Sequence, residues 1–198
     1  MTDPQPPTTD DVVALLDRLG VDRAHVAGLS IGGMTALRLA AREPQRVASL
    51  AVLCSSAHPG NEQNWRDRAA TVRTQGTGAI ADAVISRWST PEFAAANPEV
   101  IARLRKTFAA HPDEGYAGCC AVLAGLDLRP DLGRVTARTL VVSGAEDLAL
   151  PPEHQQLIAE GIPGAQFLSL SPAAHLANLE QATQVTDALI AHATGGTR

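Results

Sequence analysis

The sequence predicts an α/β protein in which a parallel sheet is interrupted by a helical insertion. Short apolar runs of strand length alternate with helical patterns near both ends of the chain, which is typical of a parallel sheet covered by helices. From about residue 59 to 131 the pattern changes to helical segments that are dense in Arg and Ala and are broken by Gly and Pro. We therefore expect one discontinuous core domain, 1–58 with 132–198, and a helical cap at 59–131.

Length and composition fit a soluble globular protein. Of the 198 residues, 45% are hydrophobic and 19% are charged, as in ordinary globular domains. The net charge of −5 offers no positive field for phosphate backbones, so we expect no nucleic-acid partner. We expect no membrane span, because Gly, Arg, Asp or Pro interrupts every long apolar run. We also expect no secretory signal, because residues 1–10 are polar and lack the charged start and apolar segment of one. Three cysteines without framework spacing fit a reducing compartment, which predicts a cytoplasmic protein.

The chain begins with a predicted helix and strand. Thr and Asp side chains at residues 8–11 can cap a helix over about 11–19, in which Val and Leu recur at helical spacing until Gly20. The run at 24–29 is short, apolar and followed closely by glycines, which suits a buried strand.

The following elements complete the predicted sheet. Met34–Arg42 reads as a helix that ends before Pro44, because the residue preceding a proline is disfavoured in a helix. The continuous apolar run at 47–54 is the next strand, so that strand, helix and strand form a parallel crossover. After the cap we expect, in order, a strand at 138–143, a helix at 152–160, a strand at 165–170 and a helix at 178–192.

A serine lies where the first strand meets the next helix. Ser30 is flanked by Gly28 and Gly32, the G-x-S-x-G pattern of a nucleophile elbow, in the strand–turn–helix context that this pattern requires. A strained turn pushes the hydroxyl out of the sheet, and we expect side chains at 28 and 32 to collide where strand and helix cross. The backbone N–H of Ile31, at the helix start, would face a developing oxyanion.

An acid and a histidine follow the serine in the order that such a nucleophile needs. Asp147 comes after the strand at 138–143, with Glu146 as its neighbouring rival, and His175 comes after the last strand. The carboxyl ends of parallel strands share one edge of a sheet, so these side chains should meet Ser30 there. His175 would accept the serine proton, and Asp147 would hold the imidazole in the required tautomer.

These features resemble the α/β-hydrolase family, and within it the 3-oxoadipate enol-lactonases of bacterial aromatic-acid breakdown. The resemblance rests chiefly on Val26–Met34 at the elbow, Ala83–Trp88 in the insertion and His175–Gln181 near the end. It implies an α/β-hydrolase sheet with a helical cap, in which Ser30, Asp147 and His175 match the nucleophile, acid and base. It further implies hydrolysis of the lactone ester of 3-oxoadipate enol-lactone to 3-oxoadipate, with no metal and no organic cofactor.

The N-terminus departs from this family. The resemblance implies strands and a helix before the helix at 11–19, including a His-Gly loop that supplies a second oxyanion N–H, yet no His-Gly pair precedes Ser30. Loss of one such donor costs roughly 10²- to 10³-fold in kcat. We therefore expect an N-terminally truncated sheet whose strand at 24–29 is an unpaired edge, open to a complementing chain or a second copy of this chain. Whether Met1 is the native start stays open.

The cap supplies the candidate pocket residues, which are Trp65, Arg66, Arg87 and Trp88. An anionic substrate of an acidic protein needs a local cation, so Arg66, Arg73 or Arg87 should face the pocket. Three interpretations stay open. The protein is an enol-lactonase, it is another small-ester or peracid-forming hydrolase of the same fold, or it is a truncated non-catalytic remnant that serves as a binding module.

Overall fold

A computed structural model describes residues 9–195. Four parallel strands form one sheet in the order β1-β2-β3-β4, with bounds Ala24–Leu29, Val47–Leu53, Arg138–Gly144 and Gln166–Leu170. In register, Ala51 of β2 lies between Ala27 of β1 and Leu140 of β3. The parallel sheet and its four strands were predicted correctly, because short apolar runs bounded by turn residues and alternating with helical patterns favour parallel strands.

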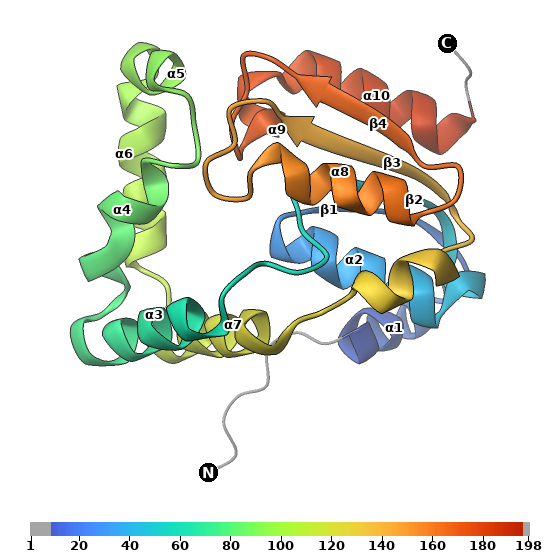
Figure 1. Cartoon of the computed structure of the whole chain (residues 1–198), viewed down its shortest axis with the longest axis horizontal. Coiled ribbons are helices and arrows are strands. Elements are labelled where there is room, and N and C mark those ends of the chain that lie inside the picture. The colour runs from blue at the N-terminus through green and yellow to red at the C-terminus, as the bar shows by residue number, and fades with distance from the viewer. Residues whose placement is uncertain (1–8, 196–198) are drawn as a thin grey trace.

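Helices cover both faces of this sheet (Figure 1). The core helices are α1 (Thr9–Arg18), α2 (Ile31–Arg42), α8 (Pro152–Gly161), α9 (Ala177–Glu180) and α10 (Ala182–Thr194), with short 3₁₀ turns at Pro44–Arg46 and Arg129–Arg134. The single helix expected at 178–192 is wrong, because the chain leaves helical geometry at Gln181 (φ −122°), whose side chain donates to the Pro172 carbonyl. None of the helices within 9–195 is long and apolar enough to cross a membrane.

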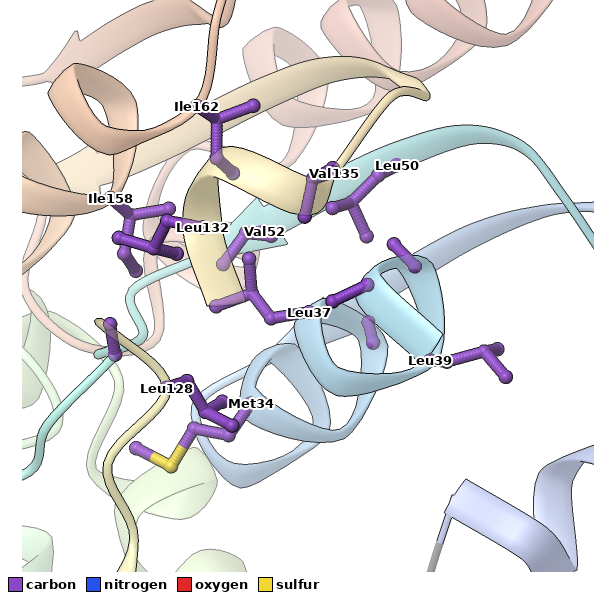
Figure 2. Packing of buried hydrophobic residues seen from close by; sticks show 14 of the residues in the cluster. Met34, Leu37, Leu39, Leu50, Val52, Leu128, Leu132, Val135, Ile158 and Ile162 are labelled. Atoms are coloured by element: carbon purple, nitrogen blue, oxygen red, sulfur yellow. The ribbon is translucent and has the colours of Figure 1, made fainter. Parts of the chain in front are cut away.

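The residues of β2 alternate between two buried clusters. Leu50 and Val52 pack in one cluster with Leu37 of α2 and Ile158 of α8, as Figure 2 shows. The side chains of Leu37 and Ile158 are fully buried. Ala51 and Leu53 point to the opposite face and pack with residues of α10. Both faces of β2 are thus covered, which explains why its sequence is a continuous apolar run.

The first strand differs from the central ones. Among residues 9–195, β1 pairs with β2 alone, and His25 and Ala27 are exposed. The expectation of an edge strand is confirmed, whereas the expectation that 24–29 is a buried strand is wrong. A short apolar run is expected for an edge strand of this kind as well as for a central strand. Only the order of the strands in the sheet distinguishes the two positions.

Every regular element in the segment between β2 and β3 is a helix. It contains α3 (Glu62–Gln75), α4 (Ala81–Ile85), α5 (Pro91–Ala96), α6 (Pro98–Ala109) and α7 (Asp113–Gly125), with a 3₁₀ turn at Thr77–Ile80. These helices stand to the left of the sheet in Figure 1, where α3 and α7 lie at the lower left and α4, α6 and α5 rise above them. They have small cores of their own, one around Phe108 and Ile85 and another around Ala69 and Ala117.

Candidate active site

The turn at Ser30 joins β1 to α2 in a backbone conformation that residues other than glycine rarely adopt. Ser30 has φ 55° and ψ −121°, and a positive φ is strained for any residue that has a Cβ. Two contacts hold this turn. Its N–H donates to the Leu53 carbonyl at 3.0 Å, and its carbonyl accepts from the Ser55 hydroxyl at 2.6 Å. Ser30 and the neighbouring Ile31, the first residue of α2, both line a pocket.

The glycines around this serine have different roles. A Cβ on Gly28 would lie 2.2 Å from the Gly32 carbonyl oxygen, so the close strand–helix crossing requires glycine at position 28, as expected. The expectation for Gly32 is wrong, because a Cβ there would meet no atom within 4 Å. The second close approach is at Gly33, where a Cβ would lie 2.7 Å from the side chain of Ser55. The pattern alone did not reveal which of the two adjacent glycines faces the strand.

Asp147 and His175 are buried together at the carboxyl ends of β3 and β4. His175 Nδ1 lies 2.8 Å from Asp147 Oδ2, and the two residues are only 5% and 1% exposed. The other carboxylate oxygen, Oδ1, accepts the backbone N–H groups of Ala149 at 2.8 Å and Leu150 at 2.9 Å. With Nδ1 engaged, Nε2 is the nitrogen of His175 that can exchange a proton in the pocket, which His175 lines together with Ser30.

The rival carboxylate, Glu146, has a different task. Its Oε1 accepts from the Ser171 hydroxyl at 2.7 Å and its Oε2 accepts from the Ala173 N–H at 2.8 Å. These hydrogen bonds, that of Ala173 first, hold the pKa of the Glu146 carboxyl below its usual range. Glu146 therefore supports the loop that leads to His175, while Asp147 contacts the imidazole itself.

The same loop is tied to the cap. Glu180 accepts from the Ala174 N–H at 2.8 Å with one oxygen, and from the Thr90 hydroxyl at 2.6 Å with the other. In addition, the Leu176 N–H donates to the Trp88 carbonyl at 2.8 Å. The position of His175 thus depends on both the sheet and the cap.

A pocket of about 440 Å³ lies between core and cap, within the size range of small-molecule sites. Ser30, Ile31 and His175 come to it from the core, and Trp65, Arg87 and Trp88 come from the cap. Further lining residues, which the sequence analysis did not single out for this role, include Asn61, Asn64, Arg68, His111, Tyr116 and Cys119.

The expectation that Arg66 faces the pocket is wrong. Its guanidinium pairs with Glu62 on the outside of α3, its side chain is 64% exposed, and it does not line the pocket. Arg73 likewise pairs with Glu114 at 3.1 Å. The pocket arginine of α3 is Arg68, whose guanidinium carbon lies 4.7 Å from the ring centre of Trp65. A helical count from Trp65 could have found it, because residues three apart share a helix face.

Partial burial changes the pKa values of two side chains that line the pocket. Desolvation, and then the charge of Arg68, lower the pKa of Arg87, and burial raises the pKa of the Tyr116 phenol. Within 9–195, His, Cys, Asp and Glu side chains form no group of three or more that could hold a metal ion.

The chain is similar in sequence to a known family and to proteins of known name. A family model described as the alpha/beta hydrolase fold matches residues 5–182. The 3-oxoadipate enol-lactonase 2 of Acinetobacter baylyi is 39% identical over 171 residues, which make up 86% of this chain and 64% of that protein. The chain therefore spans less than two thirds of the length of this curated relative.

Solved structures show the same similarity. The enol-lactonase from Burkholderia xenovorans superposes with a TM-score of 0.92 at 37% identity, over 96% of this chain and 75% of that one. A thermophilic esterase from Thermogutta terrifontis, described with malate bound, superposes with a TM-score of 0.87 at 32% identity, over 94% of this chain and 72% of that one.

Proposed function

The chain belongs to the α/β-hydrolase family, and from that premise we propose that it hydrolyses a small lactone or ester through Ser30, with 3-oxoadipate enol-lactone as its substrate. The observation that carries the proposal is the buried 2.8 Å contact between Asp147 and His175, because His175 lines the same pocket as Ser30. Similarity to enol-lactonases at 39% and 37% identity supports the choice of substrate.

The reaction begins with attack by Ser30. His175 Nε2 takes the hydroxyl proton as Oγ bonds to the lactone carbonyl carbon, and Asp147 stabilises the imidazolium that forms. The first N–H groups of a helix lack partners within the helix, so the Ile31 N–H at the start of α2 can donate to the oxyanion. Collapse of this intermediate breaks the bond to the ring oxygen, and His175 gives its proton to the enolate oxygen that leaves.

The second half of the reaction frees the enzyme. Lactone opening leaves one acyl chain on Ser30, and its enol end becomes a ketone by tautomerisation. A water molecule attacks the acyl carbon while His175 accepts one of its protons, and that proton returns to Ser30 Oγ as the new carboxylic acid leaves. The acid then loses its proton to water, so that lactone and water yield 3-oxoadipate, and His175 carries the proton in each half of the reaction.

The test compares the purified chain with Ser30→Ala. We expect wild type to hydrolyse p-nitrophenyl acetate and 3-oxoadipate enol-lactone, and to react with a fluorophosphonate probe. Ser30→Ala should lose turnover by roughly 10⁴-fold or more and lose all labelling, because no other group can replace the nucleophile. Circular dichroism establishes that both proteins are folded. A folded wild-type chain without turnover or labelling would contradict the proposal and favour a non-catalytic binding module.

A second candidate substrate class is another small ester. The similarity to a thermophilic esterase, at 32% identity, favours it. A panel of esters, lactones and peracid-forming conditions separates the candidates, since an enol-lactonase should show its highest kcat/KM with the enol-lactone.

A further inference from the structure

A glutamine on α8 is completely buried behind the candidate active site. Gln155 is 0% exposed, although glutamine side chains are mostly found at protein surfaces. It lies near the start of α8, the helix that follows the loop of Asp147. Burial of an amide costs free energy unless its hydrogen-bonding groups have partners. The contacts of the Gln155 amide therefore show what its burial achieves.

Both hydrogens of this amide and its oxygen have partners. The Gln155 Nε2 donates to the Ser55 carbonyl at 2.7 Å and to the Leu150 carbonyl at 3.1 Å. Its Oε1 accepts from the Ser143 hydroxyl at 3.0 Å. Because a carbonyl oxygen can only accept a hydrogen bond, the two carbonyls fix which end of the amide carries the nitrogen. One side chain thus connects the segment after β2, the end of β3 and the loop after β3.

The contact with Ser55 leads to the nucleophile turn. The hydroxyl of Ser55 donates to the Ser30 carbonyl at 2.6 Å, and Ser55 is itself fully buried. Space around it is tight, since a Cβ on Gly33 of α2 would lie 2.7 Å from the Ser55 side chain. Gln155 therefore holds the backbone of the residue whose side chain holds the Ser30 turn.

The contact with Leu150 leads to the acid. The Leu150 carbonyl accepts from Gln155, while the Leu150 N–H donates to Asp147 Oδ1 at 2.9 Å. The other oxygen of Asp147 lies 2.8 Å from His175 Nδ1. Without the contact from Gln155, the loop at Leu150 would lose a restraint on the carboxylate that orients the imidazole.

We propose that Gln155 is a positioning residue that holds the Ser30 turn and the Asp147 loop in the relative placement that the reaction needs. This inference rests on the proposed function for its meaning in catalysis, but the placement itself can be measured in a chain without activity. Gln155 does not line the pocket, so it acts through its neighbours and not on the substrate. A displacement of about 1 Å that originates far from the chemistry can cost about 100-fold in rate.

The first test measures acylation of wild type and Gln155→Met by p-nitrophenyl acetate before the steady state, which separates binding from chemistry. Met has a similar length and no amide, so it fills the space and leaves both carbonyls without their donor. We expect the acylation rate constant to fall by about 10- to 100-fold. The Kd of the ester should stay as in wild type, because position 155 is outside the pocket. Contacts that keep α8 in place remain, such as that of His154 Nδ1 with the Ser56 hydroxyl at 2.8 Å.

Two matched controls lie on the same helix. Gln156→Met changes the same residue type one position further along, where the side chain is exposed. Ile158→Val removes a buried methyl group and no hydrogen bond, so it lowers stability alone. Both should be acylated as wild type is, with the folded fraction of each variant measured by circular dichroism. The proposal is overturned if folded Gln155→Met is acylated as fast as wild type, or if Ile158→Val loses as much activity.

A second variant covers the case in which Gln155→Met does not fold. Gln155→Asn keeps an amide in the buried space but is one methylene group shorter, so it cannot contact all three partners at once. Its acylation rate should fall in the same direction by a smaller factor. In that case a rate equal to that of wild type overturns the proposal.

The last measurement does not depend on hydrolysis. The NMR signals of the carbon-bound ring protons of His175, assigned by comparison with His175→Gln, report the surroundings of the imidazole. Gln155→Met should shift these signals, whereas Gln156→Met should not. A shift of this kind in a chain that hydrolyses no ester would support the positioning role and refute the proposed hydrolase. Unshifted signals in such a chain would refute both, and an active chain that Gln155→Met leaves unchanged would refute the positioning role alone.

Discussion

The core side and the cap side of the pocket are built differently. On the core side, Asp147 has both oxygens engaged and is almost completely buried, and the Ser30 turn is held by backbone and side-chain hydrogen bonds. On the cap side, Arg68 and Arg87 are half-buried and, within the described chain, lack ion-pair partners. A site that performs one reaction needs fixed groups, whereas a site that selects a ligand needs groups whose partner is that ligand. The core side therefore offers the fixed groups that the proposed reaction would use, whereas the cap side offers positive groups that have no ion-pair partner within residues 9–195.

Replacement of neighbouring carboxylates tests the core side most strongly. Asp147→Asn should reduce kcat by roughly 10⁴-fold, because an amide beside His175 favours the wrong tautomer. Glu146→Gln, one residue away, should cost far less activity because Glu146 contacts only the loop before the histidine. Steady-state kinetics with a neutral ester check both variants. If the two substitutions lowered kcat equally, the separate tasks of the two acids would be refuted.

Glycine substitutions at the elbow test packing rather than chemistry. Gly28→Ala should lower the free energy of unfolding by about 1 to 3 kcal/mol, since its Cβ would overlap the Gly32 carbonyl. Gly32→Ala is the matched control, with open space around the new methyl group, and should leave stability unchanged or raise it by up to about 1 kcal/mol. Urea unfolding followed by circular dichroism measures both. Similar losses from both variants would show that the crossing is looser than the structure indicates.

The pH dependence of stability gives the smallest effect. The pKa of Glu146 is lowered in the folded protein, so the stabilisation it provides is fully present above the pKa of an unfolded Glu, about 4.3, and is lost as pH falls through the folded pKa. Wild type should therefore be more stable than Glu146→Gln near neutral pH, and the difference should shrink in acid. Urea unfolding of both proteins at stepped pH values checks this, and a pH-independent difference would exclude the ionised carboxylate as its source.

Local sequence predicted the strands and the elbow correctly because their causes are local. A short apolar run bounded by turn residues favours a parallel strand, and a serine between glycines at a strand–helix junction favours a sharp turn. The order of Ser30, Asp147 and His175 along the chain, each after a strand, then indicated a common edge. Less local features were predicted wrongly, such as the burial of 24–29 and the continuity of the helix at 178–192.

The local sequence was therefore enough to predict the parallel sheet, the sharp turn at Ser30 and the three residues that the proposed reaction would use. The three-dimensional arrangement was needed to separate two pairs of close neighbours: Arg68 rather than Arg66 lines the pocket, and Gly33 rather than Gly32 lies against Ser55. Asp147, which the sequence already favoured over Glu146, is the carboxylate that contacts the imidazole. The physical reason is the same in each case. Two residues of the same type that lie one or two positions apart look alike in the sequence, but their side chains point to different sides of the helix. Which of the two side chains contacts another part of the protein depends on segments that are distant in the chain.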